Sequence, residues 1–129
     1  MFGNLLCISA GASVGAILRW LLGLGLNAVF PPIPLGTLAA NCIGGYIIGL
    51  ATAVFSALPG LDPHWRLLVI TGFLGGLTTF STFTAEVGVL LQEQHLLLAA
   101  VAALLHLGGA LILFFLGLGT ISLVRSLGN

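Results

Sequence analysis

The sequence predicts an all-α membrane protein with four transmembrane helices. Of its 129 residues, 59% are hydrophobic and 5% are charged, whereas soluble domains carry about 25% charged residues. The mean hydropathy is +1.25. The apolar residues form continuous runs, not the alternating pattern of a membrane β-barrel. These observations exclude a soluble globular domain, a disordered chain and a nucleic-acid-binding protein.

Four apolar runs are long enough to cross the hydrocarbon layer, which takes roughly 20 residues. They predict a single four-helix transmembrane domain over residues 1–129, with spans at about 5–30, 36–58, 67–91 and 96–124. Each span ends at residues that stop a helix or prefer water. These residues are Pro31, Pro32 and Pro34; then Pro59 and Gly60; then Gln92 to His95; and finally Arg125.

Pairs of glycines four residues apart lie inside the first three spans. They are Gly11 and Gly15, Gly45 and Gly49, and Gly72 and Gly76. Small residues at this spacing allow helices to approach closely in lipid. We therefore expect tight helix packing and self-association.

The third span is unusually polar for a membrane helix. Residues 71–84 hold three glycines and six hydroxyl side chains, and Gly75–Gly76 makes a poor helix interior. A helix broken in mid-membrane frees carbonyls that can hold a cation and N–H groups that can attract an anion. The alternative is a kinked packing helix whose hydroxyls bond internally.

Three further residues mark a candidate anion site. Asn41 is a costly polar group inside the second span. Phe80 and Phe83 are three residues apart, on one helix face, and phenylalanine ring edges are weakly positive. Hydroxyl donors at Ser81 and Thr82 lie beside them. The alternatives are an interhelical hydrogen bond for Asn41 and ordinary packing for the phenylalanines.

Ionisable groups inside the spans are few. Arg19 and Glu86 could pair with each other, reach the membrane surface or line a vestibule. His106 is expected to be a packing residue that makes a hydrogen bond. No nucleophile–base pair and no metal-ligand set is visible, so we do not expect an enzyme.

Three motifs resemble those of the bacterial fluoride channels, the Fluc or CrcB family. Residues 36–41 (GTLAAN) resemble the family's G-T-L-x-x-N motif, and residues 72–83 (GFLGGLTTFSTF), with Glu86 following, resemble its third-helix signature. Residues 15–19 (GAILR) are similar to its first-helix element. The resemblance covers the whole chain and implies passive export of fluoride across the bacterial inner membrane, and thereby fluoride resistance.

The resemblance also implies an assembly and a set of site residues. Family members are antiparallel, dual-topology homodimers with two fluoride pathways. The positions that match the fluoride pathway are Asn41, Phe80, Ser81, Thr82, Phe83 and Glu86. A central sodium ion would be held by the backbone carbonyls of Gly75 and Thr78 from each subunit. Where the family often has fourth-helix hydroxyls, this chain has Ala110 and Phe114, which suggests a thinner polar track.

The charges agree with insertion in both orientations. Arg66 and Arg125 lie on one side of the membrane, the loops of the other side have no Lys or Arg, and Arg19 can reach towards it.

Two alternative functions remain. A small multidrug-resistance exporter would need a carboxylate in the first span, which has none. A structural subunit without transport activity would not explain Asn41 or the polar third span.

Overall fold

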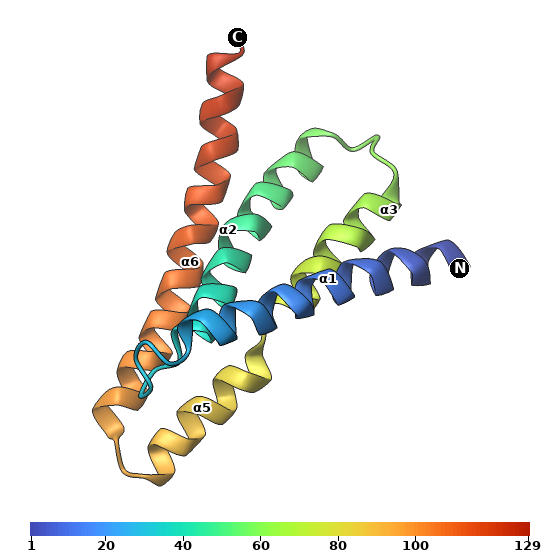
Figure 1. The fold of residues 1–129 in the computed structure, drawn as a ribbon. Helices are drawn as coiled ribbons and strands as arrows, with labels where there is room; N and C mark the ends of the chain where they lie inside the picture. Colours follow the sequence, from blue (N-terminus) through green and yellow to red (C-terminus); the bar gives the residue numbers. More distant parts are fainter.

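The helices of the computed structural model, which describes residues 1–129, form an open bundle (Figure 1). Four helical segments are long and apolar enough to cross a membrane, which confirms the all-α prediction. The elements are α1 (Phe2–Leu26), α2 (Leu35–Ala57), α3 (Pro63–Arg66), the π-helical segment η1 (Leu67–Leu74), α4 (Gly75–Leu77), α5 (Phe80–Gln92) and α6 (Leu96–Leu127). Here α3, η1, α4 and α5 together make the third segment. Helix α2 lies along α6, and α1 packs on η1 and α4.

The first helix ends at Leu26, not near Phe30 as expected. The residue that follows, Asn27, closes the start of the next helix: its Oδ1 accepts hydrogen bonds from the backbone N–H groups of Gly36 (2.8 Å) and Thr37 (3.3 Å). Helix α2 needs this outside partner because Pro34, at its N-cap position, has no side-chain acceptor. The cap fixes the end of α1 against the start of α2.

The glycine pairs produce close helix packing inside the chain. A Cβ on Gly11 would lie 2.7 Å from the backbone nitrogen of Phe73, and one on Gly45 would lie 2.6 Å from the Ala110 carbonyl oxygen. These contacts join α1 to the third segment and α2 to α6. The expected tight packing is therefore present. Because these glycines are used within one chain, they give no argument for self-association.

The third segment is broken, but not at the glycines. Gly75 and Gly76 are helical in α4, and the backbone becomes extended at Thr78 (φ −82°, ψ 153°) and Thr79 (φ −149°, ψ 112°). Thr79 is the N-cap residue of α5, where its hydroxyl accepts from the backbone N–H of Thr82. The break falls here because a threonine can begin a helix with its side chain, which glycine cannot do.

The connector before α3 carries a short polar cap. The Asp62 carboxylate accepts hydrogen bonds from the backbone N–H of His64 (2.9 Å) and from its ring Nδ1 (2.8 Å). The backbone bond first, and then the ring bond, lower the pKa of Asp62. Their stabilising effect is therefore present above the usual carboxyl pKa and is lost as the pH falls through the lowered value.

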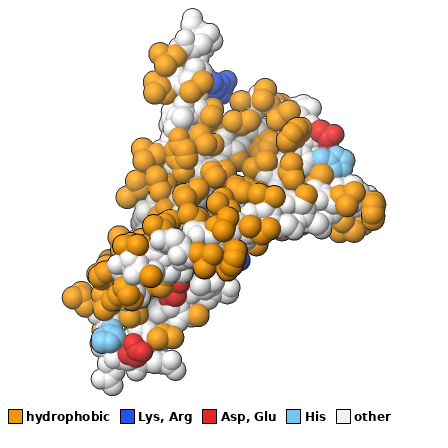
Figure 2. Space-filling model, viewed as in Figure 1, with side chains coloured by type: hydrophobic (Ala, Val, Ile, Leu, Met, Phe, Trp, Pro, Cys, Tyr) orange, Lys and Arg blue, Asp and Glu red, His pale blue; other side chains and the backbone are white.

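The surface of the chain is dominated by apolar side chains. Only 19 of 129 residues are buried, and only Leu77 among the large side chains is fully enclosed. Hydrophobic side chains are spread over the whole face in Figure 2, and charged groups form only small separate patches. A surface of this kind fits lipid or a second apolar chain rather than water.

We predict that Gly45→Ala destabilises the protein, because its methyl group would meet the Ala110 backbone. Overpacking of this kind costs about 1–3 kcal/mol. Gly88→Ala is the matched control, since a Cβ there meets nothing within 4 Å. Thermal unfolding in detergent should show a lower midpoint for Gly45→Ala alone. Equal midpoints for the two variants would contradict this account of the α2–α6 contact.

Candidate functional site

The Asn41 side chain bridges the break in the third segment. Its Oδ1 accepts from the Thr79 backbone N–H at 2.7 Å, and its Nδ2 donates to the Thr79 carbonyl at 3.1 Å. Asn41 thus provides partners for both backbone polar groups of Thr79, a residue that has left the helical pattern. A buried backbone group without such a partner would cost about 1–3 kcal/mol.

The same break leaves helix carbonyls without their regular partners. In an α-helix, the Gly75 carbonyl would accept from the Thr79 N–H, which instead donates to Asn41. The Thr78 carbonyl would likewise accept from the Thr82 N–H, which instead donates to the Thr79 hydroxyl at 3.1 Å. The Gly76 carbonyl has a substitute partner, because Arg19 Nε donates to it at 3.1 Å. The regular donors of the Gly75 and Thr78 carbonyls are therefore bonded elsewhere.

Hydroxyl groups gather at the start of α5. The Thr79 hydroxyl, which is buried, donates to Thr82 Oγ1 at 3.0 Å and lies 3.4 Å from Ser81 Oγ. Ser81 is exposed and Thr82 is half-buried. Thr79 is a residue that the sequence analysis did not single out. The available signal was its position immediately before Phe80, the first of the apolar residues that recur at helical spacing in α5.

Two aromatic rings follow the break on one face of α5. The rings of Phe80 and Phe83 have centroids 5.7 Å apart and planes tilted by 53°. Phe80 is 79% exposed, so its ring projects away from the chain. Phe83 packs against the His106 ring of α6, with centroids 4.5 Å apart.

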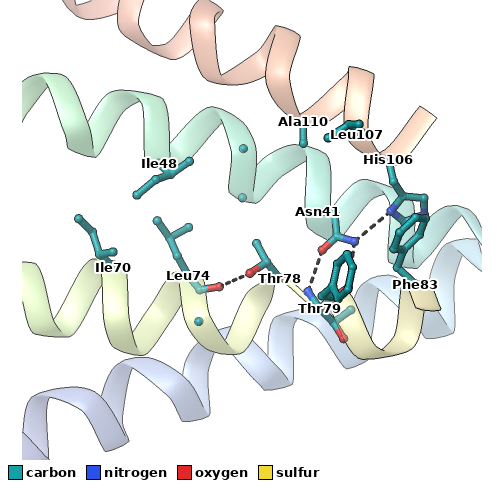
Figure 3. A pocket seen from close by; sticks show the side chains of 14 residues that line it. Asn41, Ile48, Ile70, Leu74, Thr78, Thr79, Phe83, His106, Leu107 and Ala110 are labelled. Atoms are coloured by element: carbon teal, nitrogen blue, oxygen red, sulfur yellow. Dashed lines mark hydrogen bonds between the residues drawn. The ribbon is translucent and has the colours of Figure 1, made fainter. Parts of the chain in front are cut away.

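An open pocket of about 480 Å³ lies beside the break, between α2, the third segment and α6 (Figure 3). It brings together five of the residues that the sequence singled out, and none of its lining residues is charged. Those five are Asn41, Gly75, Thr78, Phe80 and Phe83. The pocket is lined by amide and hydroxyl groups, phenylalanine rings and backbone, which can interact with ions without a fixed charge.

The remaining expected pathway residues lie outside this pocket. Ser81 and Thr82 do not line it, and neither does Glu86. Glu86 accepts a hydrogen bond of 2.6 Å from the hydroxyl of Thr37, at the start of α2. Since Arg19 is bonded to Gly76, the Arg19–Glu86 pair considered from the sequence is not formed.

Helix α6 contributes one polar group to the pocket. His106 is 5% exposed, and its Nδ1 lies 3.0 Å from Asn41 Nδ2, so it makes the hydrogen bond expected of it. Ala110, one turn further on, lines the pocket without adding a polar atom. The first residue of α6 with a hydroxyl group is Thr120, whose hydroxyl is hydrogen-bonded to that of Tyr46 in α2 at 2.9 Å. The α6 wall is therefore apolar beyond His106.

Comparison with known proteins identifies the family. A family model described as "CrcB-like protein, Camphor Resistance (CrcB)" matches residues 6–118. The chain is 63% identical to a protein of Desulfovibrio desulfuricans over 98% of both chains, and 59% identical to one of Tolumonas auensis over 97% of this chain and 98% of that one. A Pseudomonas putida protein is 61% identical over 93% of this chain and 94% of its own. All three are named "Fluoride-specific ion channel FluC". With its broken third segment and these matches along nearly its full length, the chain belongs to the CrcB family.

Proposed function

We propose that this chain forms a fluoride-specific ion channel that lets fluoride leave the cytoplasm passively, down its gradient. The observation that carries the proposal is an uncharged pocket of amide, hydroxyl and phenylalanine groups at a helix break, in a chain 54–63% identical to relatives named as fluoride channels. A channel of this kind carries out no enzymatic reaction.

The chemistry of the pocket supports an anion that binds weakly and leaves. Fluoride is small and strongly hydrated, and a conducting site must replace its water without holding it. A lysine or arginine in the pocket would hold fluoride strongly, whereas N–H donors and ring edges interact more weakly. No titratable carboxylate lines the pocket to couple protons to transport, which favours passive flux over proton-coupled drug export.

The pathway that we propose begins with Asn41, Phe80 and Phe83 in the pocket. Ser81, Thr82 and Glu86 belong to it as residues of the same helix, leading along α5 away from the pocket. Ser81 is exposed, and Thr82 and Glu86 are half-buried, so they are accessible to an ion moving along the outside of α5. In this arrangement a second chain covers the exposed side of α5 and so encloses the pathway.

The second chain is proposed to be another copy in the opposite orientation, giving a dual-topology homodimer. The exposed Phe80 ring and the scarcity of buried residues support a partner with an apolar surface. The chain has no lysine, and its formal net charge is zero. The Lys/Arg bias that fixes membrane orientation is therefore weak. We place the dimer in the bacterial inner membrane as a multi-pass protein.

A sodium ion is proposed at the centre of this dimer. The Gly75 and Thr78 carbonyls, whose helical partners are diverted, are hard oxygen donors of the kind that bind such cations. When two antiparallel copies meet at their breaks, four such oxygens surround one point. The sodium would neutralise the carbonyl dipoles and stabilise the contact between the copies.

Liposomes that contain only this protein should release fluoride rapidly and retain chloride, because the proposed pathway selects the smaller anion. A fluoride electrode and a chloride electrode in parallel measure the two rates, with protein-free liposomes as the control. Equal chloride release, or no fluoride release from correctly folded protein, would contradict the proposed function.

We predict that Phe80→Ala lowers the fluoride flux at least tenfold, because one interaction worth about 1.4 kcal/mol changes a rate by this factor. The fold should survive, since the side chain is 79% exposed. Phe2→Ala is the matched control, with a ring that is 74% exposed at the end of α1 and outside the pocket. A Phe80→Ala flux equal to that of Phe2→Ala would assign Phe80 to lipid or packing contacts.

Cysteine labelling in whole cells tests the dual topology. Single cysteines introduced at Asn4 and at Asn129, in a variant with Cys7 and Cys42 replaced by alanine, should each react partly with an impermeant reagent added outside. We expect about half of each population to be labelled, because each orientation exposes one copy in two. Labelling confined to one orientation would exclude the antiparallel dimer and the sodium site built on its symmetry.

A further inference from the structure

Both donor hydrogens of the Asn41 amide are already used within the break. One Nδ2 hydrogen goes to the Thr79 carbonyl and the other points to His106 Nδ1, while Oδ1 accepts from the Thr79 N–H. An amide side chain has two hydrogens to donate. An anion that is to be bound by Asn41 must therefore displace one of the present acceptors.

The bonding of Asn41 also determines the protonation state of His106. The amide cannot be reversed, because the Thr79 N–H requires an oxygen opposite it and the Thr79 carbonyl requires an N–H. His106 Nδ1 therefore faces a donor and must present its lone pair, so that the ring is neutral and carries its hydrogen on Nε2. Nε2 is buried and has no hydrogen-bond partner.

The two acceptors of the Asn41 amide differ in how they are held. The Thr79 carbonyl belongs to a residue whose backbone N–H and C=O are both bonded to Asn41, and displacing it would undo the break. The His106 ring makes a single hydrogen bond and otherwise packs against Phe83, at 4.5 Å between centroids. Withdrawal of the imidazole would break only that one hydrogen bond, since Nε2 makes none.

We propose that His106 Nδ1 is a placeholder acceptor that fluoride displaces from Asn41 as it passes. This inference rests on the proposed function and deepens it. In the empty channel, His106 keeps the Asn41 N–H from being an unpaired buried donor. When an ion arrives, the Asn41 N–H exchanges its bond to His106 for a bond to the ion. The net gain from this exchange is small, so the affinity of Asn41 for the ion is low and the ion can leave. His106 acts here through Asn41, as a positioning residue rather than as a ligand.

The test measures the half-saturating fluoride concentration for flux through liposomes that contain the full-length chain. His106→Leu removes the competing acceptor and has a side chain of similar size. The half-saturating concentration should therefore fall about five- to tenfold, which is the change in affinity that corresponds to the free energy of one neutral hydrogen bond. His106→Asn is the matched rescue, because its Oδ1 can take the place of Nδ1 and accept from Asn41. It should keep the wild-type half-saturating concentration.

His106→Gln completes the set, because its amide nitrogen replaces Nε2 while no acceptor stands at the Nδ1 position. The proposal expects His106→Gln to behave like His106→Leu, so the Asn–Gln pair still tests it if the leucine variant does not fold. If His106→Gln matches wild type while His106→Asn and His106→Leu both need more fluoride, His106 is itself a fluoride donor and the proposal is wrong. Unchanged half-saturation in all folded variants would also overturn it. Absence of fluoride flux in the wild type would instead remove the proposed function.

Discussion

The two hydrogen bonds between the Asn41 amide and the Thr79 peptide are the interaction on which the rest of the site depends. They join residues 38 positions apart and make an extended backbone tolerable in the middle of an apolar helical segment. Because they take the Thr79 N–H out of the helical pattern, the Gly75 carbonyl loses its regular partner. Phe80, the next residue, then begins a new helix with its ring directed outwards. Without these bonds the backbone N–H and C=O of Thr79 would lack the partners that Asn41 provides.

The few charged residues inside the membrane spans lie outside the pocket, and each has a local hydrogen-bond partner. Arg19 donates to the Gly76 carbonyl, and Glu86 accepts from the Thr37 hydroxyl. The pocket itself presents only neutral groups and rings. A charge at this depth would either bind a counter-ion tightly or demand a second charge to balance it. Rapid passage of an anion favours the neutral arrangement.

Close backbone contacts give the site its rigidity. The glycines of α1 and α2 allow their helices to lie directly against the third segment and α6, so the elements that carry Asn41, Thr79 and His106 cannot easily shift. Small changes in the distance between these elements would break a hydrogen bond at the site. Large apolar side chains face outwards instead, which leaves the outer face available to lipid or to another apolar surface.

The sequence by itself determined the four apolar helices, because hydropathy over roughly 20 residues is a local property that lipid enforces. It also marked Asn41, Phe80 and Phe83, since a polar group or a repeated ring stands out in an apolar run. It indicated a break in the third span but not its exact position, because the position is decided by Asn41 from another helix and by the capping hydroxyl of Thr79.

Only the tertiary structure decided which of the marked residues share a pocket. The sequence motif that contains Phe83 also includes Ser81 and Thr82 and is followed by Glu86. These three residues do not line the cavity, because the direction in which α5 leaves the break turns them away from it. The Asn27 cap of α2 and the His106 bond to Asn41 join residues from different helices. Such contacts depend on the way the helices pack against one another, and the local pattern of residues along one helix does not contain that information.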